Sequence, residues 1–109
     1  MTEAMVVMTT VANDAEAEQL VRALLDRRLI ACGTILSGVR SFYRWNDAIA
    51  DEREVVVLLK TNRERITPLE QAFGELHPYK MPELLALPVA AGLESYLGWI
   101  DDETRAPAE

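Results

Sequence analysis

Apolar and polar positions follow two periods along the chain, one typical of strands and one of helices. Short runs of aliphatic and β-branched residues predict strands at residues 6–11, 55–60 and 84–89. A further strand at residues 34–45 is interrupted at Ser37-Gly38, which predicts a bulge or bend. Together with the strand at 55–60 it predicts a long antiparallel hairpin, because turn-forming and charged residues separate the two.

The first helix is predicted to begin after Asn13 and to run to about Ala31, before Gly33. Asn13 is expected to cap it, since Glu16 stands three residues further on and completes a capping box. Apolar residues recur at helical spacing and are expected to face inward. They are Ala17, Leu20, Val21, Leu24 and Leu25.

Two more helices are predicted in the second half of the chain. The first is expected to be regular from about Arg65 to Leu76, after a loose turn, because Pro68 is tolerated in a first turn. Its inward residues are Ile66, Leu69, Phe73 and Leu76. A short amphipathic helix follows Gly92, with Leu93, Tyr96, Leu97 and Ile100 at helical spacing. Residues 1–4 and 104–109 are expected to be frayed.

The element order is β-α-β-β-α-β followed by a helix, which predicts a single ferredoxin-like α+β domain over residues 1–109. Two helices cover one face of a four-stranded antiparallel sheet and leave the other open. Residues 55–59 and 84–87 are nevertheless apolar at positions of both parities. The second face is therefore expected to be buried against another copy of the same sheet.

The length, net charge and cysteine content of the chain limit the partners and the location that are expected for the protein. The chain has 109 residues, a length that fits one domain, and a net charge of −7. This charge repels phosphate backbones, so cations are more natural partners than nucleic acid. Cys32 is the only cysteine, which excludes an internal disulfide framework and fits a cytoplasmic location. No apolar run approaches the roughly 20 residues of a membrane helix, so no membrane association is expected.

The segment His77-Pro78-Tyr79-Lys80-Met81-Pro82-Glu83, called the 77–83 loop below, holds the only histidine. Each proline pushes its preceding residue out of helical conformation, so the loop is expected to be stiff. His77 could bind a metal ion through its imidazole, or bond backbone carbonyls at a helix end. Glu83 could complete a two-ligand site, or accept hydrogen bonds from backbone N–H groups in the turn.

Other residues allow two interpretations each. Cys32 is expected to be a buried, inert thiol, with a redox or copper role as the alternative. Lys60 ends a strand and could meet an anion or neutralise the carboxylate of Glu83. Three residues near the hairpin tip fit a subunit interface or a small-ligand cleft between subunits. They are Tyr43, Arg44 and Trp45.

No catalytic constellation is evident. The chain has one histidine and one cysteine, without a Gly-x-Ser-x-Gly motif or a phosphate loop, so no nucleophile and base can be paired. Asp101 and Asp102 belong to an exposed terminal helix and fit solvation. We therefore expect a protein that is not an enzyme.

Seven short motifs, spread in order over nearly the whole chain, resemble the CutA family of divalent cation tolerance proteins. They are Val6-Val7-Met8-Thr9-Thr10, Leu29-Ile30-Ala31-Cys32, Ser41-Phe42-Tyr43-Arg44-Trp45, Leu59-Lys60-Thr61, His77-Pro78-Tyr79 with Pro82-Glu83, Ala86-Leu87-Pro88-Val89, and Tyr96-Leu97-Gly98-Trp99. The resemblance implies a ferredoxin-like subunit in a tight homotrimer, with the long hairpin reaching a neighbour. It also implies likeness to PII signalling proteins, which share this subunit plan and trimer.

The same resemblance implies binding of copper or other divalent ions. In some members the candidate ligands are a first-strand cysteine, the histidine before Pro-Tyr and the glutamate after proline. Here His77 and Glu83 match, but Thr9 stands at the cysteine position. No cofactor is expected to be required, and any binding of Cu²⁺ or Zn²⁺ is expected to be weak. The alternatives are a PII-like trimer that binds a small metabolite between subunits, and a structural trimer that organises a partner protein.

Overall fold

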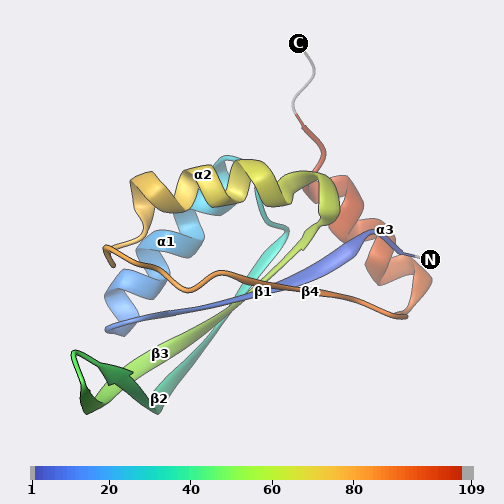
Figure 1. The fold of residues 1–109 in the computed structure, drawn as a ribbon. Helices are drawn as coiled ribbons and strands as arrows, with labels where there is room; N and C mark the ends of the chain where they lie inside the picture. The colour runs from blue at the N-terminus through green and yellow to red at the C-terminus, as the bar shows by residue number, and fades with distance from the viewer. Residues whose placement is uncertain (1, 107–109) are drawn as a thin grey trace.

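The computed structural model describes residues 2–106 and has the predicted ferredoxin-like α+β architecture. Its elements are β1 (Ala4–Val11), α1 (Asp14–Asp26), β2 (Cys32–Trp45), β3 (Ala48–Asn62), a 3₁₀ turn η1 (Arg63–Arg65), α2 (Ile66–Leu76), β4 (Leu85–Pro88) and α3 (Glu94–Glu103). The four strands form one antiparallel sheet in the order β2-β3-β1-β4. Helices α1 and α2 lie on the same side of this sheet, and α3 lies at one end (Figure 1).

The core lies between the sheet and helices α1 and α2. Strand parity decides which side chains enter it: Val7, Thr9 and Val11 of β1 are fully buried and pair with residues of β3 that are also buried. Most of the helical residues that the 3.6-residue period predicted to face inward do so, and Leu25, Leu93 and Tyr96 are the exceptions given below. Their buried residues are Ala17, Leu20, Val21, Leu24, Leu69, Ala72 and Phe73.

The opposite side of the sheet, called the uncovered face below, is apolar and partly open in the single chain. It is formed by the other parity of each strand, as the pairing of Met8 with Leu58 and Leu85 indicates. Its apolar members are Val6, Met8, Leu36, Val56, Leu58, Leu85 and Leu87. Leu36, Leu85 and Leu87 remain 43%, 53% and 50% exposed. As predicted, apolar residues occupy both faces of the sheet, while the two helices α1 and α2 cover only one of them.

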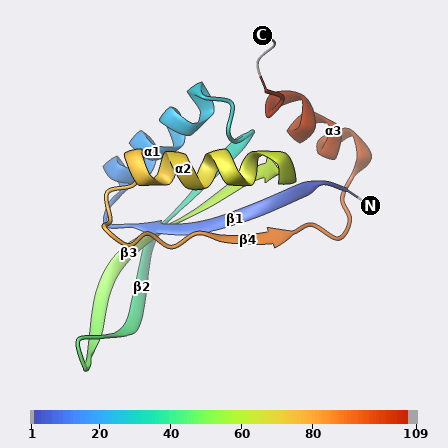
Figure 2. The same cartoon turned by 45° about the horizontal axis from the view of Figure 1, so that its top comes forward.

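Strands β2 and β3 form the long hairpin, which extends well past the helical layer (Figure 2). The predicted irregularity at Ser37-Gly38 is confirmed, because the pairing with β3 shifts between Leu36 and Val39. Gly38 has a φ of 76°, which favours glycine. The hairpin closes at Asn46 and Asp47, both with positive φ, as in a two-residue turn whose twist matches the strands.

Helix α1 ends at Asp26, so the predicted extension to Ala31 is wrong. Arg28 adopts a left-handed φ of 55°, and the amides of Arg28 and Leu29 bond back to the carbonyls of Leu25 and Leu24. This is a Schellman arrangement with arginine in the position that glycine usually takes. As a result Leu25 is 40% exposed, contrary to its predicted inward position, while Leu29 is buried.

Glu3, Ala4 and Thr104, which lie in the segments predicted to be frayed, have defined contacts in the fold. Ala4 is buried and already belongs to β1. The backbone carbonyl of Glu3 accepts a hydrogen bond from the backbone N–H of Arg63. Thr104 is 1% exposed, and its hydroxyl donates to the carbonyl of Ile100 and accepts from the amide nitrogen of Asn62. Residues 1 and 107–109, which the same prediction covered, lie outside the described residues.

Helix α3 follows Gly92 as predicted, but its apolar stripe is only partly inward. Ile100 is buried, whereas Leu93 and Tyr96 are exposed. The Tyr96 ring instead lies 5.5 Å from that of Trp99, measured between centroids. None of the helices within residues 2–106 has the length and apolarity needed to cross a membrane.

Candidate functional site

His77 lies at the C-terminal end of α2, where the following proline forces an extended conformation with φ −75° and ψ 133°. This turn directs the imidazole into the protein, and the residue is 8% exposed. The ring lies between two aromatic side chains, with centroids 5.3 Å from Phe73 on α2 and 5.2 Å from Tyr79 in the 77–83 loop. The histidine singled out by the sequence is therefore a buried residue.

Both ring nitrogens of His77 have protein partners. The backbone N–H of Tyr79 donates to Nδ1 at 3.1 Å, and Nε2 lies 3.0 Å from Oγ1 of Thr9 on β1. Burial lowers the pKa of His77. A hydrogen bond to the Thr10 backbone and the negative charge of Glu16 raise it, but their effect is smaller than that of burial. Besides this backbone contact, the partners of the imidazole are a threonine hydroxyl and a backbone N–H group.

Next to the imidazole, Tyr79 and two carboxylates form a second polar group. The phenol of Tyr79 donates to Oε2 of Glu54 on β3 at 2.6 Å. Burial, and then the hydrogen bond and charge of Glu54, raise the pKa of Tyr79. Burial also raises the pKa of Glu83, with a further contribution from the negative charge of Glu54. Sequence reasoning missed Glu54, which belongs to a charged stretch that is distant along the chain.

The donor set at this place does not fit a resident metal ion. Among residues 2–106, no three His, Cys, Asp or Glu side chains lie close enough together to hold one. Thr9, at the position where the resemblance implies a cysteine in some relatives, offers a hydroxyl that is already bonded to His77. A hydroxyl is also a far poorer ligand for copper or zinc than a thiolate. Cys32 does not supply the missing thiolate, since its sulfur lies beside Lys60 and Thr34 and not beside His77.

Cys32 is half-buried, so its prediction as a buried thiol is wrong in degree. Its sulfur lies 3.8 Å from Nζ of Lys60 and 3.8 Å from Oγ1 of Thr34. The same Nζ is 5.9 Å from the centroid of the Tyr96 ring. Lys60 therefore approaches a thiol and an aromatic ring, which are neither of the partners proposed from the sequence.

Tyr43, Arg44 and Trp45 lie at the end of β2, beside the hairpin tip, and all three are exposed. Trp45 is 53% exposed in the single chain. Phe42 and Ile49, which were not predicted to be functional, are also strongly exposed there. The sequence signal that could have identified these two residues is the presence of large apolar side chains in an otherwise charged hairpin tip. The tip is thus an apolar projection without a covering segment among residues 2–106.

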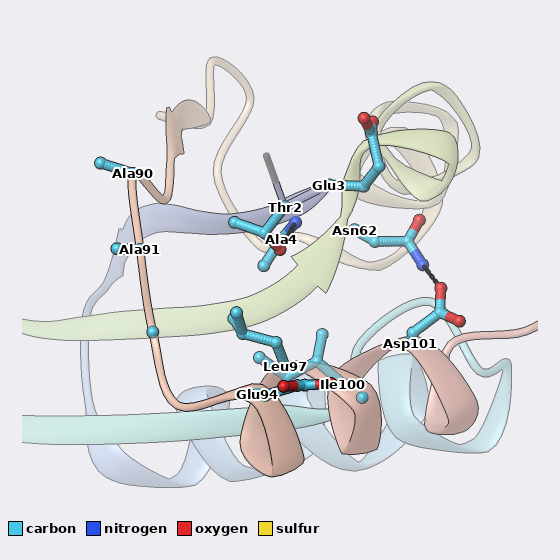
Figure 3. Close-up of a pocket in the computed structure, with 12 residues that line it drawn as sticks. Thr2, Glu3, Ala4, Asn62, Ala90, Ala91, Glu94, Leu97, Ile100 and Asp101 are labelled. Atoms are coloured by element: carbon cyan, nitrogen blue, oxygen red, sulfur yellow. Dashed lines mark hydrogen bonds between the residues drawn. The ribbon is translucent and has the colours of Figure 1, made fainter.

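A surface pocket of about 570 Å³ lies at the opposite end of the sheet, between the start of β1 and α3 (Figure 3). Apolar and acidic side chains both line it, among them Ala4, Leu97 and Ile100 and also Glu3, Glu94 and Asp101. Asn62 donates to Asp101 at 3.3 Å and to Thr104 at 2.9 Å. None of the residues predicted to be functional lines this pocket.

The buried imidazole predicts a pH dependence of stability. Since burial lowers the pKa of His77 below 6.5, the unfolded chain binds a proton more readily than the folded chain. We therefore expect the free energy of unfolding to fall as the pH is lowered from 7 through about 6.5 and below. Urea unfolding at several pH values measures this slope.

His77→Gln provides the control for this prediction, because it removes the titrating ring. The raised pKa of Glu83 acts in the opposite direction, since it favours the folded state at low pH, but the carboxylate is present in both proteins. The difference between wild type and variant therefore reports the imidazole together with any change that its loss causes in the pKa of Glu83. An identical pH slope in the two proteins between pH 7 and 5 would contradict the prediction.

Comparison with known proteins gives an independent identification. The family model described as CutA1 divalent ion tolerance protein matches residues 5–103. The divalent-cation tolerance protein CutA of Thermus thermophilus is 37% identical over 99 residues, which cover 91% of this chain and 96% of the relative. That of Pectobacterium atrosepticum is 39% identical over 103 residues, which cover 94% of each chain. The crystal structure of CutA from Xylella fastidiosa matches with a TM-score of 0.92 at 36% identity, covering 95% of this chain and 100% of the other. The chain thus belongs to the CutA1 divalent ion tolerance protein family.

Proposed function

We propose that the protein is a homotrimer that binds divalent metal ions such as copper weakly and acts in the response to them. Membership of the cation tolerance family supports the cation response. The observation that carries the proposal of self-association is the uncovered face of the sheet, with exposed Leu36, Leu85 and Leu87. The number three comes from the resemblance to CutA proteins.

The uncovered face favours a second copy of the chain as its partner. Soluble monomers seldom leave contiguous apolar patches larger than a few hundred Å² exposed. Another copy brings the same apolar face, and closed symmetry lets every copy bury it. The aromatic hairpin tip extends beyond the sheet, where it can reach a neighbour, and aromatic residues are common anchors of interfaces.

Cation binding is expected to be weak, because within residues 2–106 one chain gathers fewer than three strong ligands at any place. Glu83 is the favoured ligand, since a cation relieves its repulsion by Glu54. A neighbouring chain or water would complete the coordination. Copper is expected to bind most tightly among the first-row divalent ions, in accordance with the Irving–Williams order.

Native mass spectrometry with and without copper and zinc tests both parts of the proposal. We expect a species of three chains, each of 12.2 kDa, at micromolar concentration. Metal adducts are expected in wild type and should decrease in Glu83→Gln. Glu52→Gln is the matched control, because Glu52 is exposed on the hairpin. A monomer would contradict the assembly, and equal adducts in both variants would remove Glu83 from the site.

A further inference from the structure

We propose that His77 in this chain is a positioning residue that fastens the 77–83 loop to β1, and that its imidazole does not bind divalent metal ions. The ring joins two segments that are far apart in sequence. On one side it meets the hydroxyl of Thr9, at a separation of 68 residues, and on the other the amide of Tyr79. The inference concerns one side chain and holds for a monomer or a trimer.

The two hydrogen bonds select one tautomer of the ring. Because the amide of Tyr79 can only donate, Nδ1 must keep its lone pair. A neutral imidazole then carries its proton on Nε2, which donates to Oγ1 of Thr9. Thr9 is fully buried, so its hydroxyl has no water as an alternative partner. His77 is therefore held as a neutral ring with both nitrogens in use.

A metal ion would have to replace one of these contacts. Ligation through Nδ1 displaces the amide of Tyr79 and leaves a backbone donor without its partner. Ligation through Nε2 breaks the bond to Thr9 and requires the ring proton to move to Nδ1, where it would oppose the N–H of Tyr79. Phe73 and Tyr79 also cover the ring on two sides. The resemblance implies that His77 binds a metal ion. In this chain it does not, because the hydroxyl of Thr9 accepts a hydrogen bond from Nε2.

The imidazole of His77 positions Tyr79. The backbone of this residue is bonded to His77, and its phenol is bonded to Glu54 on β3. Two anchors therefore hold the loop, one on β1 through the imidazole and one on β3 through the phenol. Since Glu83 lies four residues further on, the same anchoring brings its carboxylate near Glu54. Loss of the imidazole should loosen Tyr79 and restore a more ordinary phenol.

Nitrogen NMR of the ring during a titration with Zn²⁺ tests the proposal. We expect Nδ1 to resonate far downfield of Nε2, the signature of the Nε2–H tautomer, and both resonances to stay unchanged as Zn²⁺ is added. Zinc binding detected elsewhere in the protein agrees with the proposal, and so does the absence of binding. The opposite tautomer, or ring resonances that shift in proportion to bound Zn²⁺, would overturn it.

Two variants test the positioning role separately from metal binding. His77→Gln should shift the highest phenol titration of the protein, assigned to Tyr79, towards that of an ordinary tyrosine. Thr9→Val removes the acceptor hydroxyl with little change in volume and should speed exchange of the Nε2 proton with water. Phe73→Leu, which alters packing beside the ring but no hydrogen bond, is the control. If His77→Gln leaves the phenol titration unchanged, His77 does not position Tyr79 and that part of the proposal is wrong.

Discussion

Trp45→Ala is expected to weaken the proposed trimer by about 2–4 kcal/mol for each interface, the loss typical of an aromatic anchor. This corresponds to a roughly 30- to 700-fold weaker contact. The reason is the position of Trp45 on a projecting hairpin, where it is 53% exposed in the single chain although its side chain can bury about 150–250 Å². Light scattering over a dilution series measures the effect, because the variant should dissociate at higher concentration than wild type.

Trp45→Phe is the matched comparison, since it retains an aromatic ring at the same place. Its assembly should lie between those of wild type and Trp45→Ala. Circular dichroism separates dissociation from unfolding, because the tip lies outside the core and the fold should persist. If Trp45→Ala assembles as wild type does at every concentration, the aromatic residues of the tip serve a ligand cleft or face solvent.

Gly33→Ala is expected to destabilise the fold by about 1–3 kcal/mol through overpacking. A Cβ at this position would lie 2.6 Å from Cγ1 and 2.7 Å from Cγ2 of Val21, closer than real Cβ contacts come. Gly33 pairs with the buried Leu59 and therefore faces α1, so the helix must move away from the sheet to admit even one methyl group. Chemical denaturation measures the decrease in the free energy of unfolding.

Two comparisons identify the clash as the cause. The double variant Gly33→Ala with Val21→Ala removes the opposing methyl groups and should recover part of the loss, relative to Val21→Ala alone. Gly74→Ala is the control for glycine replacement, because nothing lies within 4 Å of its Cβ position and it belongs to α2. That change should stabilise the protein by about 0.5–1 kcal/mol. Equal effects at Gly33 and Gly74 would exclude close packing as the explanation.

The electrostatic features of the site follow from tertiary contacts more than from composition. A net charge of −7 predicted cations as partners, but it did not indicate where they would bind. The local repulsion arises because Glu54 of β3 and Glu83 after α2 approach each other in the fold. The family assignment came from motifs spread over the chain, and the comparisons confirmed it.

Local sequence patterns correctly predicted which elements form, their order and the two faces of the sheet. These properties depend on neighbours along the chain: a two-residue period exposes alternate strand residues, and a 3.6-residue period produces one apolar helix stripe. The bulge after Leu36, the capping by Asn13 and the break before Pro78 are equally local, and all three are present. The excess of apolar residues in the strands also predicted the uncovered face correctly.

The partners of individual side chains, in contrast, depend on how distant segments pack together. The end of α1 depended on a left-handed Arg28, the burial of Thr104 on Asn62, and the lowered pKa of His77 on its burial in the fold. Each contact joins residues whose approach depends on how helices and strands pack, or on a backbone conformation that the residue type does not favour. A histidine beside a proline is compatible with a metal ligand or a buried hydrogen-bonding group, because the choice depends on what lies opposite its two nitrogens. Here the fold places a hydroxyl and an amide there, at atoms that the local sequence around His77 does not specify.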